Sequence, residues 1–243
     1  MENICKNCGD VISKNYCGNC GSKYLVEKIN GNYALQELLN LVGFEKGFLY
    51  TSKELLFNPG SVIREYINEN RQKITKPITY LILTSVIYTL ISQYFSLDIV
   101  YSDFYKKNYG ESSLANIIIW IQENMGYANI LAIFPVTIWA NLFFKNYKYN
   151  FYEVFVVISL IMGFGMLIFS LEPPIDMLFP EKMKFTNSIT ALIAFLYAGW
   201  AIGEFYGRSL KNYIKAFLTY ILGFITFQIA IIIIAIVIDV IFK

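Results

Sequence analysis

The sequence predicts an all-α polytopic membrane protein with about five transmembrane helices and a small zinc ribbon at its N-terminal end. Of the 243 residues, 56% are hydrophobic and only 16% are charged, whereas about 25% of the residues in a soluble domain are charged. Five apolar runs are long enough to cross a bilayer, and all four cysteines lie within the first 20 residues. We therefore expect a zinc ribbon at 1–24, an amphipathic juxtamembrane helical segment at 25–77, and a five-helix transmembrane bundle at 78–243.

The cysteines form two pairs with the spacing C-x2-C-x8-C-x2-C. Two intervening residues let both sulfurs of a pair reach one tetrahedral ion at ~2.3 Å. A glycine follows each pair and allows the left-handed backbone that such turns need. So short a segment cannot bury enough apolar surface to fold unaided, and a metal would supply the folding energy. The predicted ligands of a structural Zn²⁺ are Cys5, Cys8, Cys17 and Cys20.

Two other uses of the cysteines are disfavoured. Disulfides need an oxidising compartment, and the charge distribution described below places the cysteines in the cytoplasm. A redox pair is disfavoured because there are two matched C-x-x-C-G motifs and no βαβ pattern around them. Four thiolates close the coordination sphere, so a catalytic zinc is not expected.

The segment from Tyr33 to Phe57 has leucines at helical spacing with charged residues between them, which predicts one or two amphipathic helices. Gly43 and Gly47 are expected to bend or break this segment. The apolar face would lie either on the membrane surface or against the transmembrane bundle, and the sequence favours neither. Asn58-Pro59-Gly60 is a turn signal, and Ser61 is the expected N-cap of the next helix.

Four cations lie within about 15 residues of the first apolar run, close enough to attract anionic headgroups at ~1 kcal/mol each. Membrane contact and topology are their expected roles, and a site for a substrate phosphate is the alternative. These lipid and topology residues are Arg64, Arg71, Lys73 and Lys76.

The order Pro59-Gly60, Arg64-Glu65-Tyr66, Arg71 and Pro77, which follows the cysteine pairs, resembles a bacterial membrane family catalogued as domain of unknown function 3667. The resemblance covers about residues 5–82. This chain has Glu69-Asn70 where the family often has Gly-Lys. The resemblance implies a bacterial inner-membrane protein with a cytoplasmic ribbon, and it implies no activity.

The five apolar runs are Thr79–Leu97, Tyr127–Phe144, Tyr152–Leu171, Ile189–Tyr206 and Ala216–Ile238. Pro135 is expected to kink the second run. Between the runs, we expect a short helix at 112–123. We expect a turn-like, non-helical loop at 172–188, because that segment contains three prolines.

Lysine and arginine indicate the orientation of the bundle. With the N-terminus inside, segments 1–78, 145–151 and 207–215 hold 15 basic residues, and the outer segments hold five. We therefore expect a protein of the cell inner membrane with its N-terminus in the cytoplasm and its C-terminus outside.

Polar residues within the apolar runs are candidates for function. Glu204 lies four residues before Arg208 and is expected either to form a structural ion pair or to line a polar cavity with Asn141 and Gln228. Glu153 is expected to be an interface residue. Gln93, Asn141 and Gln228 are expected to be buried amides that bond across helices.

Gly199, Gly203 and Gly207 form a small-xxx-small pattern, which favours close helix packing within the bundle or between protomers. Gly163 and Gly165 offer a second such point.

We expect a non-enzymatic membrane protein whose cytoplasmic zinc ribbon is a docking or assembly module. The expected partners are membrane lipids and either a cytoplasmic protein or a second copy of the chain. A net charge of +2 does not suggest nucleic acid. The alternative is an oligomeric pore, channel or small-solute transporter gated from the cytoplasmic side. An enzyme is disfavoured because the chain has no histidine and no nucleophile–base motif, so no catalytic residue and no cofactor other than Zn²⁺ is predicted.

Overall fold

The computed structural model describes residues 4–5, 7–11, 16–21, 47–69, 71, 73–95 and 113–242. The chain forms two compact units, Met1–Val42 and Gly43–Lys243. The described part of the first unit holds the four cysteines and an isolated antiparallel bridge between Ile4 and Val11. The predicted helical pattern between residues 33 and 46 lies outside the described residues.

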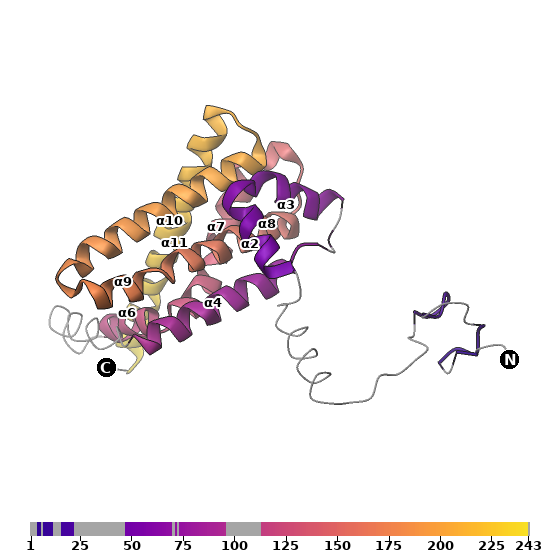
Figure 1. The fold of residues 1–243 in the computed structure, drawn as a ribbon. Coiled ribbons are helices and arrows are strands. Elements are labelled where there is room, and N and C mark those ends of the chain that lie inside the picture. The colour runs from indigo at the N-terminus through magenta and orange to yellow at the C-terminus, as the bar shows by residue number, and fades with distance from the viewer. Residues whose placement is uncertain are drawn as a thin grey trace. The chain divides into compact units, whose positions relative to one another are not determined.

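The second unit is helical throughout its described part (Figure 1). The helices are α2 (Gly47–Phe57), α3 (Pro59–Asn68), α4 (Pro77–Tyr94), α6 (Ser113–Glu123), α7 (Met125–Phe143), α8 (Phe151–Phe169), α9 (Glu172–Leu178), α10 (Met183–Tyr206) and α11 (Leu210–Phe242). Two 3₁₀ turns, η1 (Lys145–Tyr147) and η2 (Pro180–Lys182), connect α7 to α8 and α9 to α10. The all-α prediction is confirmed for this unit.

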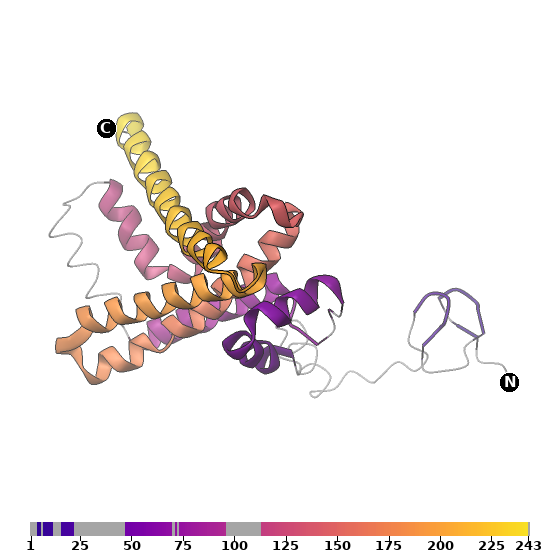
Figure 2. The same ribbon diagram turned by 90° about the horizontal axis from the view of Figure 1, so that it is seen from above.

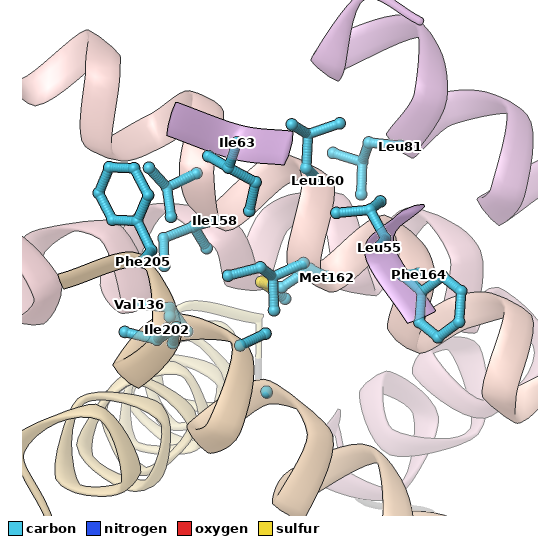
Figure 3. Packing of buried hydrophobic residues seen from close by; sticks show 14 of the residues in the cluster. Leu55, Ile63, Leu81, Val136, Ile158, Leu160, Met162, Phe164, Ile202 and Phe205 are labelled. Atoms are coloured by element: carbon cyan, nitrogen blue, oxygen red, sulfur yellow. The ribbon is translucent and has the colours of Figure 1, made fainter. Parts of the chain in front are cut away.

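Helix α8 is the centre of the bundle and packs against α4, α7 and α10, with α2 and α3 also in contact with it. An unbroken run of buried residues, Val157 to Met166, explains this position. Figure 3 shows Leu55 of α2 and Ile63 of α3 pointing toward the apolar side chains of α8 and α10. Seen from above, α11 diverges from α10 and runs toward α6 (Figure 2), where the Ser113 hydroxyl donates to the Asp239 carboxylate at 2.6 Å.

Four helices in the described part of the chain are long and apolar enough to cross a membrane. These candidate spans are Met125–Phe143, Phe151–Leu178, Phe185–Tyr206 and Leu210–Ile241. Five spans were expected, and α4, which forms over the first apolar run, is not among the four. Its 18 residues include three threonines, two serines and a glutamine, and these polar residues reduce its mean hydropathy.

Several local predictions need correction. Ser61 is not an N-cap, because α3 begins at Pro59 with Asn58 in the capping position. Residues 172–188 are not a non-helical loop, because α9, η2 and the start of α10 occupy them. The prolines of α9 stand in its first turn, where no backbone N–H is needed. By contrast, the short helix expected at 112–123 is confirmed as α6, and α7 continues through Pro135.

Candidate metal centre and a polar cluster at the end of α10

The four cysteines converge on one point. Their Sγ atoms all lie within 4.8 Å of one another. Two Sγ pairs, Cys5–Cys20 and Cys8–Cys17, are each 3.5 Å apart. A tetrahedral ion at ~2.3 Å from each sulfur separates the sulfurs by about 3.8 Å. The cluster can therefore hold a four-coordinate metal ion with little rearrangement.

The backbone around each cysteine pair forms the same turn. The Gly9 N–H donates to the Cys5 carbonyl at 2.9 Å, and the Gly21 N–H donates to the Cys17 carbonyl at 3.0 Å. Both glycines have a positive φ, 78° and 73°, in the left-handed region that a side chain would disfavour. The first cysteine of each pair is thereby buried while the second is exposed.

The thiols are crowded as the structure stands. The pKa of Cys8 is raised to about 12: a hydrogen bond with the Asp10 backbone lowers it, and the thiols of Cys20, Cys17 and Cys5 together with burial outweigh that effect. A thiolate in this cluster therefore needs a cation beside it, which a metal ion would provide.

A second site gathers polar side chains around the C-terminus of α10, and we call it the α10 cap cluster. Its members are Arg64, Glu204, Arg208, Asn212 and Tyr213. They come from α3, α10, the connection after it, and the first turn of α11. The last carbonyl groups of a helix have no partner within that helix, and this cluster supplies partners for three of them.

Arg64 supplies two of these partners. Its Nη1 atom donates to the Glu204 carbonyl at 2.6 Å and to the Phe205 carbonyl at 2.8 Å. The Asn212 amide donates to the next carbonyl, that of Tyr206, at 2.8 Å. Cationic and amide donors also suit the negative end of the helix dipole. Arg64 was expected to contact lipid, and the structure places it on protein.

The Glu204 carboxylate is fully engaged within the cluster. It accepts from Arg208 Nε at 2.8 Å and from the Tyr213 hydroxyl at 2.6 Å. The Glu204 side chain is 11% exposed, and that of Arg208 is 75% exposed. This arrangement is the structural pair that the i,i+4 spacing predicted.

The other predicted cavity residues lie elsewhere. Gln228 lines a cavity of about 140 Å³ between α7, α8 and α11, together with Asn129. Asn141 is half-buried near the end of α7, and Glu204 belongs to the α10 cap cluster. The structure therefore does not bring Glu204, Asn141 and Gln228 into one described cavity. Gln93 and Gln228 are exposed and are not the buried amides that were expected.

The other predicted lipid-contacting cations and Glu153 occupy three kinds of position. Arg71 folds back on α3, where Nε donates to the Tyr66 carbonyl at 3.3 Å and the guanidinium lies 5.9 Å from the centre of the Tyr66 ring. Lys73 and Lys76 are exposed. Glu153 forms a capping box with Asn150 at the start of α8, a more specific role than the interface position expected for it.

The glycine face of α10 packs against α11 of the same chain. A Cβ on Gly199 would collide with the Phe217 ring, and one on Gly203 would lie 2.7 Å from Cε1 of Tyr213. Gly207 ends α10 with a φ of 106°. A Cβ on Gly163 would lie 2.9 Å from the Tyr80 ring and 3.3 Å from the Leu81 Cα of α4. Packing at these glycines occurs within one protomer.

Sequence reasoning missed three residues of this region. Asn212 and Tyr213 join the α10 cap cluster, and the Tyr197 hydroxyl donates to the Leu55 carbonyl at 3.1 Å. Neither Tyr197 nor Tyr213 belongs to a motif. Tyr197 gave one signal, because a tyrosine hydroxyl within an apolar run needs a hydrogen-bond partner when it is buried, whereas Tyr213 lies between two apolar runs and gave none.

Comparison with known families bears on this region. Residues 45–89 match a family model described as "Protein of unknown function (DUF3667)". The match contains Gly60, Arg64 and Tyr80, which join α2, α3 and α4 to the bundle. It supports the resemblance seen in the sequence over that segment, while the cysteine pairs lie outside it. No curated protein and no solved structure gives a significant match to the chain.

Proposed function

We propose that this chain is a non-enzymatic inner-membrane protein that carries a zinc-ordered docking or assembly module in the cytoplasm. The observation that carries the proposal is the gathering of four thiols within 4.8 Å in a chain that also has four candidate membrane spans. A closed four-thiolate site orders a small module without supplying catalysis, so its surface is suited to binding a protein.

The exposed faces of the bundle support its placement in a bilayer. On α7 the exposed side chains are apolar and recur every three or four residues, and on α11 most of the apolar side chains are exposed, for example Ile229, Ile233 and Val237. Large apolar faces of this kind mark contact with membrane or protein. The exposed side chains on α7 are Tyr127, Leu131, Phe134, Ile138 and Leu142.

We propose α4 as the fifth span. Apart from Gln93 in the last turn, its exposed side chains form an apolar stripe with a period of four residues: Ile78, Ile82, Val86, Leu90 and Tyr94. Its polar side chains Thr84 and Ser85 are buried, and the Thr84 hydroxyl donates to the Tyr80 carbonyl at 3.0 Å. At ~1.5 Å per residue, 18 residues reach about 27 Å, close to the ~30 Å hydrocarbon core.

The α10 cap cluster supports a rigid connection between the juxtamembrane helices and the bundle. Arg64 and Tyr197 attach α3 and α2 to α10, and Phe48 packs on Tyr80 with ring centres 5.4 Å apart. A partner that binds on the N-terminal side of α2 would thus bind next to helices that are attached firmly to the transmembrane bundle.

Two measurements test the proposal. Metal analysis of the purified chain should give one Zn²⁺ per protein. A pull-down from the cytoplasmic fraction should lose its specific partners in the Cys17→Ser/Cys20→Ser variant and keep them in Asn19→Ala, which alters the same turn without removing a ligand. Identical partners in both variants would contradict the docking module.

A C-terminal reporter tests the number of spans. Five spans with a cytoplasmic N-terminus place the C-terminus outside, where alkaline phosphatase fused there is active. If the phosphatase fusion is inactive and a fluorescent protein fused at the same end is fluorescent, the C-terminus is in the cytoplasm and the number of spans is even.

A further inference from the structure

A large apolar groove runs along the second unit between α2, α8, α9 and α10. Its volume is about 870 Å³, near the upper end of the roughly 300–1,000 Å³ that ligand sites occupy. Buried Phe164, Thr190 and Tyr197 lie at its base. Ile175, Phe179, Phe185, Ile189 and Ile193 line it with partly exposed apolar surface.

Two polar side chains of the groove lining, Ser52 and Tyr197, have hydrogen-bond partners within the protein. The Tyr197 hydroxyl at its base donates to the Leu55 carbonyl at 3.1 Å, and Ser52 bonds the Tyr80 hydroxyl at 3.0 Å. Because each of these polar groups already has a partner within the protein, the surface offered to a ligand is almost entirely apolar. The lining thus suits a hydrocarbon chain.

The described charged residues that line the groove are all basic. Lys53 of α2 and Lys182 of η2 line the groove, and none of the described lining residues is acidic. Both lysines are exposed, and the Lys182 ammonium lies 5.4 Å from the centre of the ring of Phe179, another lining residue. A ligand that complements these features combines an apolar chain with an anionic head.

We propose that the groove binds one anionic phospholipid taken from the surrounding bilayer. Its acyl chains pack on the side chains of α8 and α10, and its phosphate pairs with the Lys182 ammonium group at the end of the groove beside Phe179. This inference rests on the membrane placement proposed above, since α8 and α10 are candidate spans. It does not depend on the zinc-ordered module or on the number of spans.

The test is native mass spectrometry of the full chain, purified in detergent and supplied with equal amounts of phosphatidylglycerol and phosphatidylcholine. We expect one phospholipid per chain, with phosphatidylglycerol preferred. Ile193→Trp should fill the groove and lower lipid occupancy at least ten-fold. Leu192→Trp is the matched control, because Leu192 is an exposed neighbour on the same helix and does not line the groove. Equal occupancy in the two variants would overturn the proposal.

A second pair of variants tests the charge. Lys182→Gln should reduce the preference for phosphatidylglycerol by about five-fold, since a basic residue near anionic lipid contributes ~1 kcal/mol. Lys145→Gln, which changes an exposed lysine outside the groove, should leave the preference unchanged. An equal loss in both variants would mean that overall charge, and not the groove, selects the lipid.

Further outcomes identify a different occupant. Excess inorganic phosphate should not displace the lipid, and displacement by phosphate would identify an anion site without a chain. If the parent chain instead has the mass of a dimer without lipid, and Ile193→Trp has the mass of a monomer, the occupant of the groove is a second copy of the chain.

Each variant must have the same elution volume and unfolding midpoint as the parent. If Ile193→Trp fails this check, Ile189→Trp provides a second variant that fills the groove. Release of the parent chain from membranes by alkaline carbonate would contradict membrane placement, independently of lipid occupancy.

Discussion

Gly60 of α3 lies directly against the backbone of Glu204 on α10. A Cβ at Gly60 would come within 2.5 Å of the Glu204 carbonyl oxygen and within 2.8 Å of the Glu204 Cβ. The contacting atoms belong to the helix itself and cannot rotate away. The position therefore admits only glycine while α3 and α10 keep their present distance.

Gly60→Ala should consequently push α3 away from α10. Overpacking at a rigid contact costs typically about 1–3 kcal/mol, so the unfolding midpoint in detergent should fall. Gly165→Ala is the control, because a Cβ there meets no described atom within 4 Å, and alanine favours a helix over glycine by roughly 1 kcal/mol. A drop of equal size in both variants would contradict the packing argument.

Arg64→Gln should loosen the same interface. The change leaves the Glu204 and Phe205 carbonyls without their shared donor, and an unsatisfied buried acceptor costs about 1–3 kcal/mol. Arg64→Lys keeps the charge but replaces the Nη1 donor that both carbonyls share with the ammonium of a more flexible side chain, so it should fall between the parent and Arg64→Gln. Hydrogen exchange of the α3 amides measures the loosening, and unchanged protection in Arg64→Gln would refute it.

Glu204→Gln should have a small effect on stability and none on solute flux. The Arg208 partner is largely exposed, and exposed pairs contribute about 0–1 kcal/mol, while glutamine still accepts from Tyr213. A double-mutant cycle with Tyr213→Phe in thermal unfolding isolates the remaining coupling. A proteoliposome flux that disappears in Glu204→Gln would instead favour the pore.

Removal of the metal should unfold the cysteine unit and leave the helical bundle intact. The small unit depends on its ion for folding energy, whereas α2 to α11 pack around their own apolar core. A chelator should therefore abolish protease resistance at residues 4–21 while the circular dichroism near 222 nm changes little. Loss of the helical signal together with the zinc would show that the two units depend on one another.

Composition and periodicity were sufficient to predict the helical class, the approximate positions of the apolar runs and the cysteine cluster. These features are local, because each depends on residues within about 25 positions of one another. The Glu204–Arg208 pair was predictable for the same reason. The two residues are one helical turn apart.

The contacts of Arg64 were not predictable in this way. Its distance in sequence from the first apolar run is typical of a cation that contacts lipid. Its actual acceptors are backbone carbonyls, and because every residue has one, the sequence does not indicate which of them Arg64 bonds. The same holds for Tyr197 and Leu55, which are 142 residues apart. Gly60 shows the limit most clearly. In the sequence, the turn signal Asn58-Pro59-Gly60 was a sufficient reason for a glycine at this position. The close approach of α10 depends on tertiary packing and has no signal in the sequence.

The link between Arg64 and Glu204 also imposes an order of assembly. The two residues are separated by 140 positions, so α3 leaves the ribosome long before the carbonyls that it will cap have been synthesised. Until α10 has formed, Arg64 and Gly60 lack their native contacts with Glu204. Helices α2 and α3 can contact α4 and α8 earlier, but the contact between α3 and α10 forms only after residue 204 has been synthesised, and a chain terminated before that residue would lack it.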